Sequence, residues 1–384
     1  MAEPLRVALI APPFEAVPPR LYGGTERVVD HLARGLSSAG AEVTLFASGD
    51  SQSAGRLVPV VPEALRLMKK PVTDYGAVHL KMLVEIQDFI RDSAREREIQ
   101  IIHNHHDFWM LPLAGQFNIP TLTTLHGRLD LPDFIPTWRS APKRHGYISI
   151  SHSQRLPTPD LNWIANIPHG IAVDTYPYRE QPGSYLAFLG RICPEKRPEW
   201  AVQIAQKSGI PLKIAAKIDG REGRDWYDTH IKHHVDGKFI EYIGEISEHE
   251  KGDFLGNALG LAFPIDWPEP FGLVMIESLA CGTPVLARPC GSVNEILENE
   301  RTAFIENDLI DLARRARDLE SLSRRECRKV AEERFSLRRM VEDHLDVYRR
   351  IRELGNVGES RHRRDLLHTL KRTTQRDPQT HAQG

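Results

Sequence analysis

The chain of 384 residues is long enough for two domains that each bury a core of their own. Its 50 Lys and Arg residues are balanced by 52 Asp and Glu residues, which excludes a general electrostatic attraction to nucleic acid. No stretch reaches the ~20 apolar residues of a membrane span, and the apolar run at residues 5–10 is too short for a signal peptide. We therefore expect a cytoplasmic protein whose only membrane contact is peripheral.

The four cysteines, Cys193, Cys281, Cys290 and Cys327, are scattered and lack the close spacing of a metal site. They fit reduced thiols of a cytoplasmic protein better than a disulfide framework. An Asp-x-Asp metal motif is also missing from the sequence. We expect neither a metal nor another cofactor.

Short apolar runs alternate with amphipathic segments along the first half of the chain, a pattern typical of strands and helices that pack in layers. Strands are expected near residues 7–10, 43–46, 57–61, 99–106, 120–126, 147–151 and 164–171, and helices over residues 25–38 and 77–97. A boundary is expected around residues 174–182, where prolines and a polar run interrupt the pattern.

The alternation of strands and helices then starts again. Strands are expected near residues 185–190, 212–216, 239–244, 259–263 and 284–287, and helices over residues 198–208, 249–257 and 271–282. Two successive series of this kind predict an α/β fold of two Rossmann-like domains with parallel sheets. Their ligand should lie at the carboxyl ends of the strands, in the cleft between the domains.

Gly23 and Gly24 stand just before the first expected helix. Glycines let the backbone come close to a ligand, and the N–H groups of a helix start point at it. A plain turn is the alternative interpretation.

Three histidines and an aspartate, His103, His105, His106 and Asp107, follow one another in five positions near the end of an expected strand. A metal site is one interpretation. However, alternation along a strand sends His103 and His105 to one face and His106 to the other. Polar residues at a strand end more often line a cleft, so we favour a contact with an acceptor substrate.

His126 closes another expected strand and could be either a structural or a cleft residue. The segment after it, residues 128–144, contains Trp138 and several prolines. We expect this segment to be a variable loop that faces the cleft and sets the choice of acceptor.

Arg191 and Lys196 follow the first strand of the second half. At a strand end they are able to reach the cleft and neutralise a diphosphate, with Arg as a planar fork and Lys as a point charge. Solvated surface side chains are the alternative.

The stretch at residues 264–282 combines a strand end, a turn with two prolines and the start of a helix. A helix start attracts anions, and Gly272 has no side chain to keep a phosphate away from the N–H groups. Glu269 before the helix and Glu277 inside it can bracket such an anion and accept bonds from hydroxyl groups. A phosphate flanked by two sugars, as in a nucleoside diphosphate sugar, fits this arrangement, whereas two solvated glutamates are the alternative.

Residues 269–285 resemble the Glu-x7-Glu signature of the retaining family 4 glycosyltransferases almost residue for residue. Residues 190–198 are similar to the Gly-Arg…Glu-Lys element of the same family, and the resemblance extends to about Ile351. It implies a GT-B fold and the transfer of a sugar from a nucleotide donor to an acceptor hydroxyl with retention of configuration. It also implies that no metal is required.

The resemblance implies a role for each matching residue. Arg191 and Lys196 would bind the donor diphosphate together with the backbone at the start of the helix, Glu269 the transferred sugar, Glu277 the ribose, and His126 a sugar hydroxyl. The expected catalytic residues are His126, Glu269, Arg191 and Lys196, and the expected donor-binding residues are Gly23, Gly24, Arg191, Lys196, Glu269, Phe271, Gly272, Leu273, Val274 and Glu277.

The expected partners are a UDP-, GDP- or ADP-sugar and a carbohydrate or lipid-linked acceptor, without nucleic acid. Two other functions stay open from the sequence. One is a nucleotide-sugar epimerase of the same fold, and the other is a non-catalytic subunit that binds nucleotide sugars.

Two positions depart from the family pattern. Gly127 follows His126 where the family often has Asp, so the sequence does not say what orients this histidine. Cys290 and Gly291 replace the family's Gly-Gly pair ahead of Glu295.

We expect an acceptor-side domain at residues 1–175, a donor-side domain at 176–335 and a helix at 336–354 that crosses back to the first domain. Residues 355–384 are polar and weakly basic, and we expect a mobile tail there. Contact of this tail with an anionic membrane is the alternative.

Overall fold

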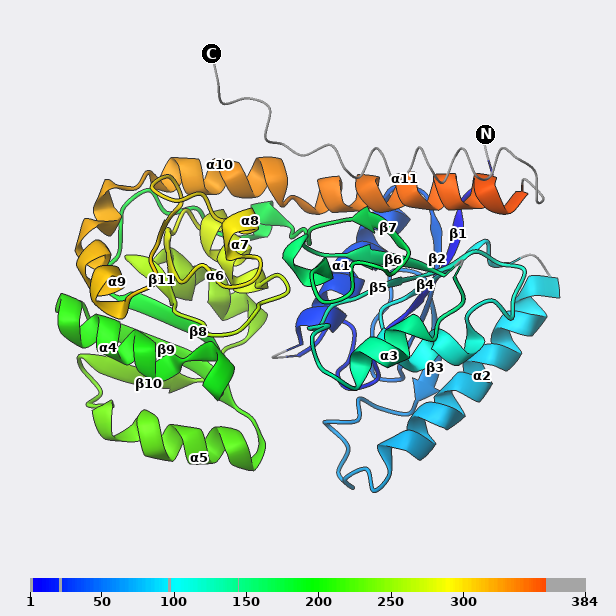
Figure 1. The fold of residues 1–384 in the computed structure, drawn as a ribbon, viewed down its shortest axis with the longest axis horizontal. Helices are drawn as coiled ribbons and strands as arrows, with labels where there is room; N and C mark the ends of the chain where they lie inside the picture. Colours follow the sequence, from blue (N-terminus) through cyan, green and yellow to red (C-terminus); the bar gives the residue numbers. More distant parts are fainter. Residues whose placement is uncertain (1–2, 21–22, 96–97, 144, 357–384) are drawn as a thin grey trace, which may run out of the picture.

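The computed structural model describes residues 3–20, 23–95, 98–143 and 145–356. Within them, two separate sheets lie side by side, each covered by helices (Figure 1). The expected tail at residues 357–384 lies outside the described part of the chain. Among the described residues, no helix has the length and apolar character needed to cross a bilayer.

The first sheet has seven strands in the order β3-β2-β1-β4-β5-β6-β7. Their bounds are β1 Arg6–Ile10, β2 Glu42–Ser48, β3 Arg56–Val61, β4 Ile101–Asn104, β5 Thr121–Thr124, β6 Gly146–Ser149 and β7 Trp163–Asn166. Every neighbouring pair is parallel.

The second sheet has six strands in the order β10-β9-β8-β11-β12-β13, again with all neighbours parallel. Their bounds are β8 Leu186–Ile192, β9 Leu212–Ile218, β10 Ile240–Gly244, β11 Gly260–Phe263, β12 Val285–Ala287 and β13 Ala303–Ile305. Strands β1 and β11 are almost continuously apolar and buried because helices cover both faces of a parallel sheet. The two sheets confirm the predicted α/β fold.

The helices have the bounds α1 Gly24–Ser38, α2 Tyr75–Arg95, α3 Phe134–Arg139, α4 Pro198–Ser208, α5 Gly220–His230, α6 Glu248–Gly256, α7 Leu273–Ala280, α8 Val293–Ile296, α9 Leu309–Arg315, α10 Arg324–Arg334 and α11 Leu337–Asn356. Helices α10 and α11 follow one another along the top of the view in Figure 1, from the second sheet back to the first. Met340 and Tyr348 of α11 are buried in the same core as Val28 and Leu32 of α1. The last helix therefore completes the first core.

The segment at residues 128–144 differs from the expected cleft-facing loop. It contains helix α3, and Trp138 in this helix is buried against Leu125, Leu129 and Tyr147. The reason is hydrophobic: an indole buries a large apolar area, which outweighs the turn tendency of the surrounding prolines.

Helix α7 is shorter than expected at both ends. It begins at Leu273 instead of Phe271, because Gly272 adopts φ +81° and ψ 70° in the left-handed region and stands as the N-cap. It ends at Ala280, ahead of Gly282, which also has a positive φ. Helices α3 and α5 and strand β13 were not predicted from the sequence, whereas α9 confirms the charged, helical segment expected from Leu309 onward.

Candidate functional site

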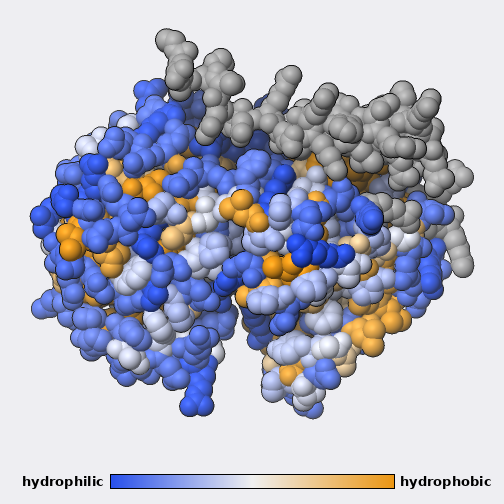
Figure 2. Space-filling model, viewed as in Figure 1, coloured by the Kyte–Doolittle hydropathy of each residue, from blue (hydrophilic) through white to orange (hydrophobic). Residues whose placement is uncertain are grey.

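A cleft of about 600 Å³ lies between the two sheets and is lined by residues of both domains. In the space-filling view it belongs to the groove that separates the two halves of the molecule (Figure 2). This volume suits a ligand of the size of a nucleotide or a small oligosaccharide. The lining comes from loops at the carboxyl ends of the strands, where ligands of parallel sheets bind.

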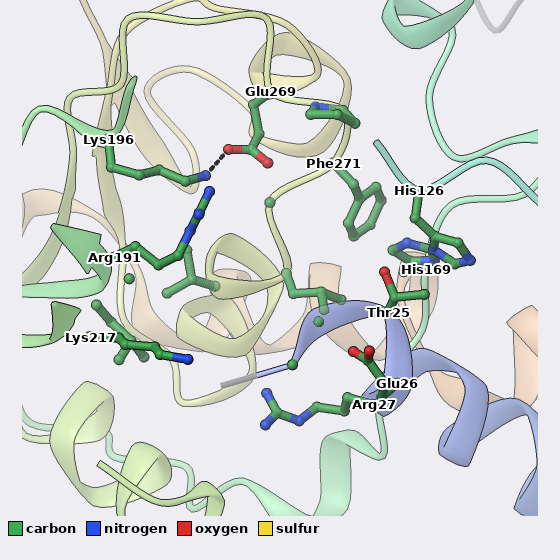
Figure 3. A pocket seen from close by; sticks show the side chains of 18 of the residues that line it. Thr25, Glu26, Arg27, His126, His169, Arg191, Lys196, Lys217, Glu269 and Phe271 are labelled. Carbon is green, nitrogen blue, oxygen red and sulfur yellow. Dashed lines mark hydrogen bonds and ion pairs between the residues drawn. The ribbon is translucent and has the colours of Figure 1, made fainter. Parts of the chain in front are cut away.

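All the residues that the sequence singled out for donor binding or catalysis line this one cleft. They are Gly23, Gly24, His126, Arg191, Lys196, Glu269, Phe271, Gly272, Leu273, Val274 and Glu277. In Figure 3, Arg191, Lys196 and Lys217 lie on one side of the cavity, and Phe271 stands between Glu269 and the pair His126 and His169.

Lys196 and Glu269 form a direct ion pair at the cleft wall (Figure 3). Trp267 supports both partners, since its Nε1 donates to Glu269 Oε2 at 3.0 Å and its ring centroid lies 4.8 Å from Lys196 Nζ. A pair that is braced in this way keeps a cation and a carboxylate side by side, ready to contact a phosphate and a hydroxyl group.

The start of α7 forms the floor of the cleft. A Cβ atom on Gly272 would come within 2.8 Å of Met275 Cε and 3.3 Å of Glu269 Cγ, so this left-handed position requires glycine. The glycine pair of the first domain reaches across to the same place, because a Cβ on Gly24 would lie 3.7 Å from Leu273 Cδ1. Both helix starts, α1 and α7, therefore aim their N–H groups at the cleft.

Glu277 is 2% exposed and is surrounded by polar partners. Lys251 Nζ lies 3.0 Å and Arg27 Nη1 3.6 Å from its Oε1, and the Tyr176 hydroxyl oxygen lies 3.4 Å from the same atom. These cations offset the cost of burying the carboxylate. Arg27 and Lys251 were not predicted from the sequence as site residues.

His126 is oriented by another histidine. Its Nε2 is 2.9 Å from His105 Nδ1, and its ring stacks on His169 at 5.1 Å between centroids. Burial lowers the pKa of His126 to about 3, with a smaller contribution from His344. Its Nδ1 is buried and has no hydrogen-bond partner in the described part of the chain.

The polar run after β4 divides between two faces, as the alternation predicted. His105 packs with His103 at 4.1 Å between ring centroids, whereas His106 stacks on His79 at 4.9 Å. His106 and Asp107 line the cleft. Among the described residues, no group of three or more His, Cys, Asp or Glu side chains could hold a metal ion.

Two carboxyl groups of the cleft have raised pKa values. Burial raises the pKa of Asp107 to about 6 and that of Glu26 to about 7, although nearby Arg66 opposes the shift of Glu26. Asp107 also has φ 42°, an uncommon conformation for a residue with a side chain. Neither residue was singled out for the donor site from the sequence.

Lys217 could have been predicted from the sequence as a cleft residue, but it was not. It lies near the end of β9, beside Arg191 in the neighbouring strand β8, and both side chains line the cleft. The rule that had identified Arg191, a basic side chain at a strand end, applies equally to this lysine.

Comparison with known proteins gives two family matches. The model of Glycosyl transferases group 1 matches residues 179–334, and that of Glycosyltransferase Family 4 matches residues 22–172. Glycogen synthase of Mycobacterium tuberculosis is 23% identical over 343 residues, with 74% of this chain and 79% of the relative covered.

Two solved structures illustrate the likeness in fold. Sucrose-phosphate synthase from Thermosynechococcus elongatus superposes with a TM-score of 0.73 at 18% identity, covering 90% of this chain and 99% of that one. HepE from Anabaena, in complex with UDP and glucose, superposes with a TM-score of 0.68 at 13% identity, covering 89% and 98%.

Proposed function

The chain belongs to the glycosyl transferases group 1, the family 4 glycosyltransferases with a GT-B fold, and on this premise we propose which reaction its cleft supports. This glycosyltransferase moves a hexose from a nucleoside diphosphate sugar to an acceptor hydroxyl, with retention of configuration and without a metal. The observation that carries the proposal is that Arg191, Lys196 and the start of α7 converge on one cleft that also holds Glu269 and Glu277.

The leaving group determines what the cations do. When the bond between the sugar and the diphosphate breaks, negative charge develops on the phosphate oxygens. Arg191, Lys196 and the N–H groups at Gly272 to Val274 surround the place where we put this diphosphate. Fixed donors at developing charge are usually the largest contribution to catalysis.

The carboxylates and the histidine position the sugars. We assign Glu269 to the transferred sugar, Glu277 to the ribose hydroxyls and His126 to a sugar hydroxyl from the facing domain. Because burial lowers the pKa of His126 to about 3, this side chain acts as a neutral hydrogen-bonding group.

The bond changes require no protein nucleophile. The acceptor oxygen forms its bond to the anomeric carbon on the face that the diphosphate leaves, and the departing phosphate oxygen takes the proton of the acceptor hydroxyl. The products are a glycoside of unchanged configuration and a protonated nucleoside diphosphate. The UDP bound to HepE supports the choice of donor class, while the different names of the relatives leave the acceptor class open.

Thermal unfolding with a panel of UDP, GDP, ADP and their sugars tests the donor site. A nucleotide at about 100 times its Kd stabilises the folded protein by about 2.7 kcal/mol, and the matching base should raise Tm. Lys196→Ala and Glu277→Gln should lose this shift, whereas Lys213→Ala should keep it because Lys213 pairs with Glu241 and does not line the cleft. A folded wild type that no nucleotide stabilises would contradict the donor assignment.

Product analysis then tests the reaction. The matching donor is incubated with carbohydrate and lipid-linked acceptors, with and without EDTA, and the anomeric configuration of the product is read by NMR. We expect a product of retained configuration whose rate EDTA does not change. Donor turnover to an isomeric nucleotide sugar without acceptor would favour an epimerase, and binding without any turnover would favour a non-catalytic subunit.

A further inference from the structure

An ion cluster joins the two domains beside the donor site. Arg27 comes from α1 of the first domain, whereas Glu248 and Lys251 come from α6 and Glu277 from α7 of the second. Arg27 Nη2 is 2.8 Å from Glu248 Oε2, and its Nη1 is 3.6 Å from Glu277 Oε1. The Arg27 side chain is only 7% exposed, so salt screens these contacts weakly.

The charges of the cluster are balanced. Two cations, Arg27 and Lys251, face two carboxylates, and Lys251 Nζ lies 3.1 Å from Glu248 Oε2 and 3.0 Å from Glu277 Oε1. The Tyr176 hydroxyl donates to Glu248 Oε1 at 2.9 Å. Removal of one cation would leave a buried carboxylate whose negative charge is no longer fully balanced by neighbouring positive charges.

Glu277 has two carboxylate oxygens. Arg27 and Lys251 both lie close to Oε1, at 3.6 Å and 3.0 Å. We assign the other oxygen, Oε2, to the ribose hydroxyls, so that the ion cluster stays intact while a nucleotide is bound. The interdomain contact and a bound nucleotide are thus compatible.

Helix α1 transmits the position of Arg27 to the cleft. Gly24 and Glu26, at the start of the same helix, line the cleft, and Gly24 approaches Leu273 at the start of α7. Leu273 itself packs against the cores of both domains. Holding Arg27 against the second domain therefore also holds the two helix starts together.

We propose that Arg27 is a positioning residue that couples nucleotide binding to the closure of the two domains. The inference rests on the proposed function, because it takes Glu277 as the ribose ligand. The closed arrangement that Arg27 stabilises is the one that encloses the nucleotide. By linkage, nucleotide binding favours closure by the same factor by which closure strengthens nucleotide binding, so a weaker interdomain contact also weakens nucleotide binding.

Isothermal titration calorimetry with the matching nucleoside diphosphate tests the coupling. We expect Arg27→Gln to raise the Kd on the order of tenfold, a common size for such coupling, and Arg27→Lys to restore part of the affinity. Arg34→Gln is the matched control, since Arg34 lies on the same helix, is half exposed and pairs with Asp30 of its own domain. Small-angle X-ray scattering should show that the nucleotide compacts the wild type and Arg34→Gln but not Arg27→Gln.

Glu248 separates coupling from direct contact. It holds Arg27 but does not line the cleft, so Glu248→Gln should weaken nucleotide binding through the ion cluster and not through loss of a contact with the nucleotide. The double variant of Arg27→Gln and Glu248→Gln should then bind no more weakly than the weaker single variant. A wild-type Kd for Glu248→Gln would overturn the proposal, because the interdomain contact between Arg27 and Glu248 would then have no influence on nucleotide binding.

Two further outcomes distinguish the possible failures. If the wild type binds a nucleotide and Arg27→Gln binds it equally well, the coupling is wrong and the donor site stands. If the wild type binds no nucleotide, the proposed function itself fails. Circular dichroism confirms the fold of each variant, and should Arg27→Gln not fold, Arg27→Lys and Glu248→Gln carry the test.

Discussion

Gly291 occupies a position that accepts no side chain. It has φ +61°, and a Cβ atom there would lie 2.3 Å from the backbone N and 2.4 Å from the backbone O of Glu269. The next residue, Ser292, donates its N–H to Glu269 O at 2.9 Å and its hydroxyl to Phe271 O at 2.8 Å. This loop therefore packs against the segment that contains Glu269, the residue that we assign to the transferred sugar.

Gly291→Ala should therefore cost both stability and donor affinity. The positive φ alone costs about 1–2 kcal/mol, and the clash with Glu269 adds to it. Gly237→Ala is the control, because Gly237 has φ +71° with no atom within 4 Å of its Cβ position. Urea unfolding and nucleotide titration measure both effects; an equal loss in the two variants would show that the clash does not matter.

At the scale of elements, Arg324 ties α10 to two other helices. Its guanidinium is buried and donates to Arg179 O, Gly256 O, Ala258 O and Thr283 Oγ1 at 2.6–3.0 Å. Gly256 is the last residue of α6, where a helix leaves carbonyls without intrahelical partners, and Ala258 follows two positions later. One side chain thus fixes how α6, α7 and α10 meet behind the cleft.

Replacing this arginine should loosen the second domain. Arg324→Met leaves several buried carbonyls without a donor, and we expect a loss of about 3 kcal/mol or more in the free energy of unfolding. The neighbouring exposed Arg325 offers a matched substitution, Arg325→Met, with an expected change within about 0.5 kcal/mol. Urea unfolding of both variants measures the difference, and equal stabilities would contradict this role of Arg324.

At the scale of the whole molecule, a row of histidines, all buried except the half-buried His126, links α11 to the cleft. In order they are His344, His103, His105, His126 and His169, with ring centroids 4.1–5.4 Å apart between neighbours. Tyr348 and Thr124 bind the two nitrogens of His103 at 2.6 Å and 2.8 Å. Burial lowers the pKa of all five, to about 4 for His344 and about 3 for His126.

This row predicts how stability depends on pH. The folded protein keeps these histidines neutral, whereas the unfolded chain protonates them near pH 6.5, so unfolding takes up protons. The free energy of unfolding is therefore unaffected by these histidines above pH 6.5. As the pH falls from 6.5 toward 4, it decreases by up to about 1.4 kcal/mol per histidine and pH unit.

Urea unfolding at pH 7.5, 6.5 and 5.5 measures this slope. We expect a steep loss of stability between pH 6.5 and 5.5, a smaller slope for His344→Gln, and an unchanged slope for His249→Gln, whose side chain is exposed. Stability that stays level down to pH 5.5 would contradict the prediction.

The sequence by itself determined the architecture and most of the proposed donor site. Continuous apolar runs such as residues 7–10 are typical of parallel strands covered on both faces, and the order of strands and helices then leaves few topologies. The ligand-binding edge follows from that topology. The strand ends and one helix start place Arg191, Lys196 and residues 269–277 near this edge, and the resemblance to the family 4 glycosyltransferases then implied their roles.

Only the tertiary structure decided which distant residues complete the cleft. Arg27 and Glu277 are 250 positions apart in sequence and meet because two domains pack together, which no local period reveals. The same holds for His105, which orients His126, and for Gly291, whose missing side chain admits Glu269. Trp138 was misjudged for this reason: its neighbours suggested a loop, but burial of its large apolar surface decided its place.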